Sequence, residues 1–322
     1  MVLLGKAFNK MHTYKLTLIT LALVLFVSCI KKDKNTSNTT TSDKTVITNP
    51  TKPRELSEDF KNYWYSGLAE ITSYRLQQER YGQIHEGTAV NIFVSEDLLP
   101  DTQVKANNVS EENISVLKLN STKKFNTGIY PYSIMTSTFS PIISKGHALK
   151  VSNSVQEWCG QAYTQLNTRE EFEVESHSYF EGEADQAFVL PKTWLEDELW
   201  NLIRINPEEL PTGDVMIIPS FEYSRLKHKK LEEQKAFASL KQGDSITIYT
   251  LNYPEIQRQL MLFFNSEFPY EIEKWEETNA ADQNDTLRLK TTAVKLKRLL
   301  TPYWRQHKNE DSFLRDSLDL TY

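Results

Sequence analysis

The sequence is poor in glycine and proline and has a single long apolar run. Ten glycines and twelve prolines among 322 residues exclude a collagen-like or Pro/Gly-rich chain. Otherwise 39% of the residues are hydrophobic and 25% are charged, which is the profile of an ordinary globular protein. Fifteen tyrosines, fifteen phenylalanines and six tryptophans are plentiful, and such residues favour strands and large binding surfaces.

The chain also lacks an excess of positive charge and the common catalytic motifs. Its formal net charge of −6 disfavours non-specific binding to nucleic acid. The patterns H-E-x-x-H, paired C-x-x-C, Walker loop and G-x-S-x-G do not occur. We therefore expect no cofactor, no metal ion and no nucleic-acid partner.

The apolar run lies near the amino end, in MHTYKLTLITLALVLFVS (residues 11–28). Lys15 provides a positive start, and Leu16 to Val27 is a stretch of twelve residues. This length suits the apolar region of a signal peptide and is short for a membrane span of about 20 residues. We expect residues 1–28 to be a signal peptide that starts at Met1 or Met11.

The run ends in Ser28-Cys29, which resembles a bacterial lipobox, although Phe26 replaces the usual leucine. In a lipobox the cysteine is acylated, and each buried CH₂ of an acyl chain contributes about 0.8 kcal/mol to membrane binding. We expect lipidation at Cys29 and a lipid anchor as the contact with the membrane. A plain secretory signal with an incidental cysteine, or a short anchor helix, is the alternative.

Residues 29–54 are rich in Thr, Ser, Asn and Lys and too polar to fold alone, which predicts a flexible tether. Ile30 after the cysteine resembles lipoproteins of the Gram-negative outer membrane, on either its periplasmic or its surface side. With Cys29 lipidated, Cys159 has no partner. Its neighbours Trp158 and Gly160 offer no base, so a buried, unreactive thiol is expected there.

From residue 55 to residue 322 the pattern is that of one β-rich globular domain. Aromatic and β-branched runs alternate with polar turns, for example near Gly82–Gly87 and around Tyr253-Pro254-Glu255. They predict a mainly β protein (β-rich α+β) with one large curved antiparallel sheet or half-barrel. Residues 213–230 are expected to be strand. Two fused halves joined near 193–206 would fit the length.

One main helix is predicted near 193–206. Thr193 and Glu196 form a capping box, T-x-x-E, before an apolar stripe. The stripe consists of Leu195, Leu199 and Leu202 at helical spacing. Asn206-Pro207 ends the helix.

The stretch EFEVESHSYFEG (residues 171–182) is the best candidate for chemistry. On a strand, Glu173, Glu175 and His177 share one face. Two carboxylates and an imidazole could perform acid–base catalysis in an envelope hydrolase. The alternative is the polar outer face of a half-buried strand.

Basic and aromatic stretches suggest a ligand. RLKHKKLEEQK (residues 225–235) could meet phosphates of a lipid or glycan, or simply be exposed charge. Aromatic residues at 63–65, 130–132 and 303–304 could stack on sugars, line an apolar groove or pack in the core.

Several stretches resemble a family of Bacteroidota lipoproteins over nearly all of the mature chain. The clearest are FKNYWYSGLAEITSYRLQQERYG, NSVQEWCGQAYTQLN and LTPYWRQHKNEDSFLRDSLDL. Members often carry the label "septum formation inhibitor Maf", but the Ser-x-Ser-Pro-Arg-Arg type motif of Maf nucleotide pyrophosphatases is absent here. The resemblance implies export and lipidation but no specific activity.

We therefore expect a lipid-anchored envelope lipoprotein with a binding or scaffolding role and an apolar or glycan ligand. By analogy with curved-sheet lipoprotein carriers, an apolar ligand would lie on the concave side of the sheet. A hydrolase built on Glu173, Glu175 and His177 is the alternative, and a Maf-like nucleotide pyrophosphatase is the weaker one.

Overall fold

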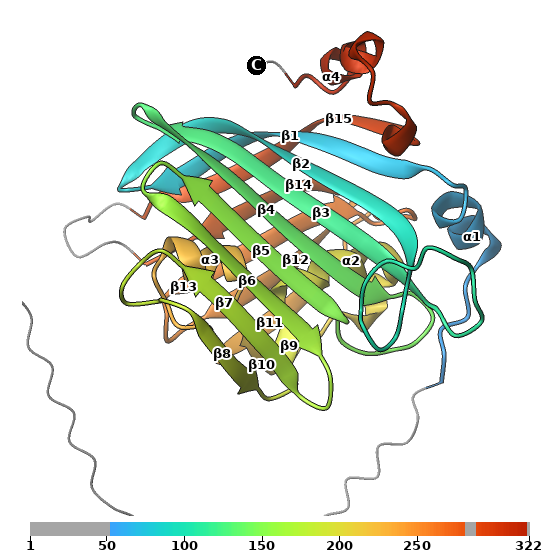
Figure 1. Ribbon diagram of the computed structural model, residues 1–322, viewed down its shortest axis with the longest axis horizontal. Coiled ribbons are helices and arrows are strands. Elements are labelled where there is room, and N and C mark those ends of the chain that lie inside the picture. Colours follow the sequence, from blue (N-terminus) through green and yellow to red (C-terminus); the bar gives the residue numbers. More distant parts are fainter. Residues whose placement is uncertain (1–51, 281–287, 321–322) are drawn as a thin grey trace, which may run out of the picture. The chain divides into compact units, whose positions relative to one another are not determined.

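The central feature of the protein is one continuous sheet of fifteen strands. It is seen in a computed structural model that describes residues 52–280 and 288–320 (Figure 1). The strand order is β8-β7-β6-β5-β4-β3-β2-β1-β15-β14-β13-β12-β11-β10-β9, so the first and last long strands pair in the middle. The mainly β class and the open, curved sheet predicted from the sequence are confirmed. The predicted signal peptide, Cys29 and nearly all of the tether lie outside the described residues.

The first half of the sheet is an antiparallel meander. Its strands are β1 (Ala69–Arg80), β2 (Gln83–Leu98), β3 (Ile114–Thr127), β4 (Tyr130–Pro141), β5 (Lys150–Glu157), β6 (Gly160–Thr168), β7 (Phe172–Ser178) and β8 (Gln186–Leu190). Consecutive antiparallel strands alternate in direction. The β1–β2, β3–β4, β5–β6 and β7–β8 turns therefore all lie at the same end of the sheet. The turn between β1 and β2 falls at Tyr81-Gly82, as the sequence predicted.

The second half is also a meander, apart from its edge. Its strands are β9 (Trp194–Leu195), β10 (Gly213–Ile218), β11 (Gln234–Lys241), β12 (Ile246–Tyr253), β13 (Arg258–Asn265), β14 (Ile272–Thr278) and β15 (Lys290–Thr301). β9 runs parallel to β10, so the sheet is not wholly antiparallel. The predicted hairpin around Tyr253-Pro254-Glu255 joins β12 to β13.

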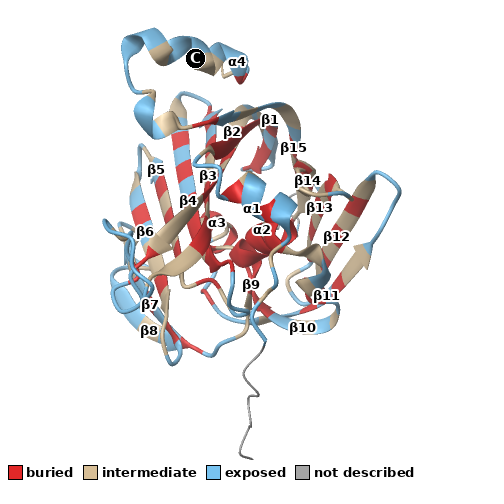
Figure 2. Cartoon of the chain, turned by 90° about the vertical axis from the view of Figure 1, so that its right-hand side faces the viewer, coloured by how far each residue is buried: buried red, intermediate tan, exposed pale blue. Residues whose placement is uncertain are grey.

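Alternating side chains give the sheet a buried concave face. Along β12 and β13, every second residue is buried, including Tyr249, Leu251 and Leu262. A strand that alternates in this way packs one face on a core and leaves the other face accessible. Figure 2 shows the core as the space between the two arms of the sheet, filled by the helices α2 and α3.

Helix α2 (Glu196–Ile205) follows the edge strand β9 and lies inside the sheet. The predicted stripe of Leu195, Leu199 and Leu202 is buried. The prediction of Thr193 as the N-cap is wrong. Leu195 occupies that position, and its backbone N–H donates to the Glu198 carboxylate at 3.1 Å. Thr193 lies instead directly before β9, where its hydroxyl donates to the Met216 carbonyl of the neighbouring β10.

Short helices lie before β1, in the links that follow α2 and β10, and after β15. They are α1 (Glu58–Trp64), η1 (Pro207–Glu209), α3 (Phe221–Leu226), η2 (Tyr303–Arg305), η3 (Asn309–Ser312) and α4 (Phe313–Ser317). The prediction of strand throughout residues 213–230 is wrong. Pro219 cannot donate to a sheet ladder, and the Ser220 hydroxyl then caps α3 by accepting the Tyr223 N–H at 3.2 Å. None of the helices in the described ranges has the length and apolar character to cross a membrane.

Candidate ligand-binding site

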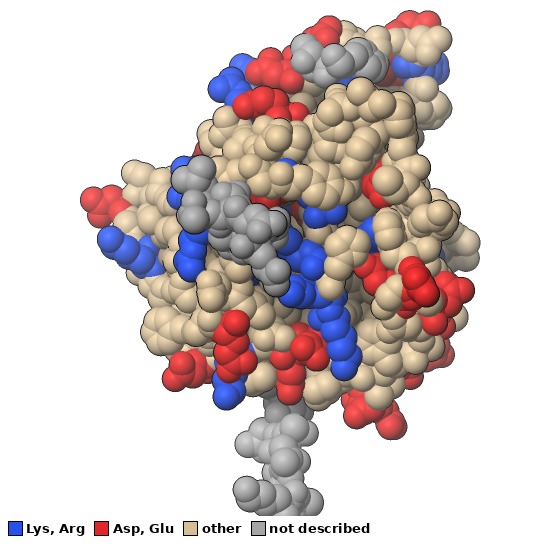
Figure 3. All heavy atoms as spheres, turned by 90° about the vertical axis from the view of Figure 1, so that its left-hand side faces the viewer, with Lys and Arg blue, Asp and Glu red and all other residues tan. Residues whose placement is uncertain are grey.

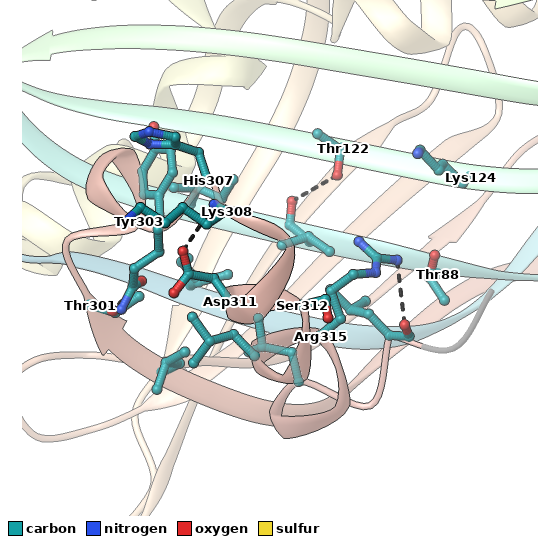
Figure 4. Close-up of a pocket in the computed structure, with 18 residues that line it drawn as sticks. Thr88, Thr122, Lys124, Thr301, Tyr303, His307, Lys308, Asp311, Ser312 and Arg315 are labelled. Carbon is teal, nitrogen blue, oxygen red and sulfur yellow. Dashed lines mark hydrogen bonds between the residues drawn. The ribbon is translucent and has the colours of Figure 1, made fainter.

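A cavity of about 430 Å³ lies on the outer face of the central strands, under the C-terminal segment of residues 301–320. We call it the outer cavity. Its apolar lining comes from both walls and consists of Ile71, Val90, Ile92, Leu299, Leu314, Leu318 and Leu320. Figure 4 shows the C-terminal segment crossing the outer surface of the strands with the lining side chains between them.

The floor of the outer cavity exists because the central strands are apolar on both faces. On β2, Ala89 and Phe93 point into the core and are fully buried, whereas Val90 and Ile92 point outward. An outward aliphatic pair on a strand usually indicates that something covers it. Here the cover is the C-terminal segment, which buries Leu318 against the sheet.

The rim of the outer cavity is polar and carries several cations. Lys124 reaches it from β3, and His307, Lys308 and Arg315 reach it from the C-terminal segment (Figure 4). The Lys308 backbone N–H donates to the Asp311 carboxylate at 3.0 Å, which holds the turn before α4. The Arg315 Nη2 donates to the Leu320 carbonyl at 3.4 Å and so folds the chain end back over the cavity.

The volume and the lining together favour a small apolar ligand. Pockets that bind small molecules typically enclose about 300–1,000 Å³ and combine apolar walls with a few polar groups. The outer cavity meets both conditions, with aliphatic walls and a cationic rim. Tyr303 is its one aromatic lining residue, and burial raises the pKa of that phenol. The phenol therefore stays neutral at physiological pH.

A second group of polar residues lies inside the core, around the start of α2. Arg258 bridges two acids, with Nη2 2.7 Å from Glu196 and Nε 3.1 Å from Glu277. Lys123 pairs with Glu222 at 2.7 Å. Burial raises the pKa of Asp197 to about 8, so this carboxyl is neutral at pH 7.

This buried network borders a cavity of about 40 Å³. That is room for a few water molecules, since one water needs about 10–15 Å³ of such space. It is too small for a substrate. The network instead holds α2 in place, because its side chains come from α2, α3 and strands of both halves of the sheet.

The structure places Glu173, Glu175 and His177 on the outer face of β7, with the side chains of Phe172 and Val174 buried on the other face. His177 is 60% exposed and lies 3.2 Å from Asp185, which is itself exposed. None of the three lines the outer cavity, the buried network cavity or the grooves beside them. The three side chains therefore do not face any of these four cavities. The hydrolase hypothesis stays a prediction.

The expectation of a buried thiol at Cys159 is wrong. Cys159 lies in the turn between β5 and β6 and is exposed, because a two-residue turn leaves no core to cover it. A hydrogen bond with the Glu157 carboxylate raises the pKa of the Cys159 thiol, which opposes formation of a nucleophilic thiolate.

Residues 52–280 and 288–320 hold no group of three or more His, Cys, Asp or Glu side chains placed to bind a metal ion. The concave side, where an apolar ligand was expected, is occupied by α2 and α3. The apolar space lies on the opposite face of the sheet.

Sequence reasoning did not find the outer cavity, although two signals for it were present. In GTAVNIFVSEDLL, both alternating sets are apolar, so both faces of β2 needed cover. In FLRDSLDL, Leu314 and Leu318 are four residues apart, the spacing of an apolar helix face. Only the fold shows that these two faces meet.

Comparisons with protein-family models, with curated proteins and with solved structures found no match to this chain. The resemblance to Bacteroidota lipoproteins stays a prediction, and any functional conclusion depends on the geometry.

Proposed function

We propose that this protein is a lipid-anchored lipoprotein of the outer membrane, periplasmic or surface-exposed, that binds an apolar chain-like ligand in the outer cavity. The observation that carries the proposal is the cavity of about 430 Å³ with aliphatic walls on both sides. The sequence supports the anchor through the apolar run that ends at Cys29.

The cationic rim suggests an acidic end on the ligand. An acyl chain would bury its CH₂ groups against Val90, Ile92 and Leu318, each contributing about 0.8 kcal/mol. Its carboxylate or phosphate would remain at the rim beside Lys124. A long-chain fatty acid is the simplest molecule with both properties.

The test is binding of a fluorescent long-chain fatty acid to the detergent-solubilised full chain. The substitution Ile92→Trp should fill the cavity and weaken binding by about tenfold or more. The matched control is Val294→Trp, because Val294 is exposed on β15 and does not line the cavity. The control should bind like the wild type.

Two outcomes would contradict the proposal. One is the absence of probe binding to the wild-type protein. The other is an equal loss with Ile92→Trp and Val294→Trp, which would place the binding elsewhere on the sheet surface. Thermal unfolding of both variants separates loss of binding from loss of folding.

A further inference from the structure

Aromatic side chains gather at the end of the sheet where the β1–β2, β3–β4 and β5–β6 hairpins turn. Tyr81 is 55% exposed, Trp158 is 67% exposed, and Tyr179, which follows β7, is 72% exposed. Tight turns normally carry Gly, Asn or Asp. Large rings at successive turns expose apolar surface that the fold itself does not need.

The backbone at Tyr81 is held in an unfavourable conformation. Its φ is +54°, and the following Gly82 has φ +70°. A left-handed conformation costs little at glycine but is rare for a bulky residue. The hydroxyl of Tyr81 meets that of Tyr132 at 2.9 Å, and the Arg80 guanidinium stacks 4.2 Å from its ring centre.

The rings form a connected series. Trp158 and Tyr130 are stacked at 6.4 Å with planes 29° apart, Tyr130 and Tyr132 are 5.8 Å apart, and Tyr132 stacks on Phe125 at 4.8 Å. Beyond Trp158, the ring of Tyr179 lies so close to Gly160 that a Cβ there would be 2.7 Å from it. Each ring is therefore held by a neighbour, so little side-chain entropy is lost when a ligand stacks on the series.

A basic segment borders the same end of the sheet. Arg225 stacks 4.1 Å from the ring centre of Phe180, and the Arg80 side chain donates to the Leu226 carbonyl, which joins this segment to the ring series. His228, Lys229 and Lys230 follow and are exposed. Figure 3 views this end and shows Lys and Arg side chains in the middle of the face, with Asp and Glu mostly toward its edges.

A groove of about 780 Å³ runs between this basic segment and the edge strand β8. The acids that line it already have partners: Glu183 lies 2.8 Å from His228 and 3.3 Å from Arg225, and Asp185 lies 3.2 Å from His177. Lys230 lies 3.7 Å from Glu232, whereas Lys229 makes no ion pair with a described residue. Within the described residues, the Lys229 ammonium is therefore a positive charge of the groove that no carboxylate pairs with.

We propose that this end of the protein binds an acidic oligosaccharide, with sugar rings against Trp158, Tyr130 and Tyr81 and carboxylates beside Lys229 and Lys230. Aromatic faces accept the apolar C–H faces of sugar rings, while tyrosine hydroxyls bond to sugar hydroxyls. Lysine and arginine provide charge-assisted hydrogen bonds to carboxylates. A neutral apolar ligand would leave the cations unused, and a lipid headgroup has no series of rings to stack.

The test is calorimetric titration of the detergent-solubilised full chain with tetragalacturonate, and with neutral cellotetraose for comparison. The acidic sugar should bind more tightly, and high salt should weaken its binding. Trp158→Ala should weaken it by about tenfold or more. Lys229→Gln with Lys230→Gln should weaken it and reduce its dependence on salt.

The matched control is Trp304→Ala, since Trp304 is also exposed but lies in η2, away from the ring series. It should bind tetragalacturonate like the wild type. Fatty-acid binding in the outer cavity should survive Trp158→Ala, which separates this proposal from the proposed function. Near-UV circular dichroism confirms that each variant is folded.

Three results would overturn the proposal: no binding of tetragalacturonate, binding that Trp158→Ala leaves unchanged, or tighter binding of an oligothymidylate. The last would assign the rings and lysines to single-stranded nucleic acid, which also stacks on aromatic faces. A fourth result, equal binding to phosphatidylglycerol vesicles that Trp158→Ala retains, would also overturn the proposal and assign the lysines to a membrane surface.

Discussion

Arg204 and Glu70 form a two-pronged ion pair in the centre of the protein, with Nη1–Oε1 at 2.6 Å and Nη2–Oε2 at 2.7 Å. The two residues are 134 positions apart in sequence, and each side chain is 1% exposed. The pair ties α2 to β1, the strand at which the two halves of the sheet meet. The Arg204 side chain also donates to the Pro269 carbonyl at 2.8 Å.

Removing one partner of this pair should destabilise the fold strongly. Arg204→Met removes the cation that forms both short hydrogen bonds to the buried Glu70 carboxylate and leaves only Arg298, 3.8 Å away. Breaking a buried pair in this way typically costs about 3–5 kcal/mol. Urea unfolding should show that loss in the free energy of unfolding. Arg305→Met is the control, because Arg305 is exposed, and it should change stability by less than about 0.5 kcal/mol. Equal stability of the two variants would contradict the buried pair.

Asp197 should make stability depend on pH. Burial raises the pKa of this carboxyl from its ordinary value of 3.8 to about 8 in the folded protein. The folded state therefore holds a proton that the unfolded state releases. The stabilisation is complete below pH 3.8 and is lost as the pH rises toward 8.

The variant Asp197→Asn isolates this contribution, because the amide cannot ionise and its oxygen can still accept the Phe221 N–H bonded at 3.1 Å. Between pH 5 and pH 7, the wild type should lose stability relative to the variant by about 1.4 kcal/mol per pH unit. Denaturant unfolding across this range measures the difference. A difference that does not vary with pH would show that Asp197 ionises normally.

Cys29 should carry the membrane anchor. The wild-type protein should partition into the detergent phase, and mass spectrometry should find an acylated cysteine at the mature amino terminus. Cys29→Ser should remain unacylated. Cys159→Ser is the matched control and should behave like the wild type, since the other cysteine lies in an exposed turn. A mature chain that begins at another residue would contradict the lipoprotein prediction.

Glu173, Glu175 and His177 should tolerate substitution. Because all three lie on the exposed face of β7, the variant with Gln at each position should unfold within a few degrees of the wild type. Hydrolysis of nitrophenyl esters and phosphates should be the same for both proteins. A hydrolytic activity present in the wild type and lost in the variant would support the alternative function.

The sequence by itself determined the features that depend on neighbours in the chain. Alternation along β12 and β13 predicted strands, the Tyr253-Pro254-Glu255 turn predicted their hairpin, and the leucine spacing predicted α2. These patterns repeat every two or about 3.6 residues, so a short window contains them. The apolar run before Cys29 is equally local.

Only the tertiary structure decided which of these elements meet. The outer cavity combines β2 with a segment more than two hundred residues later, and the ring series combines turns of three hairpins. The polar residues Glu196, Asn201 and Arg204 of α2 are buried as well, because the sheet closes around the helix. Their partners, such as Glu70 and Arg258, come from distant strands, and no local pattern specifies such pairings.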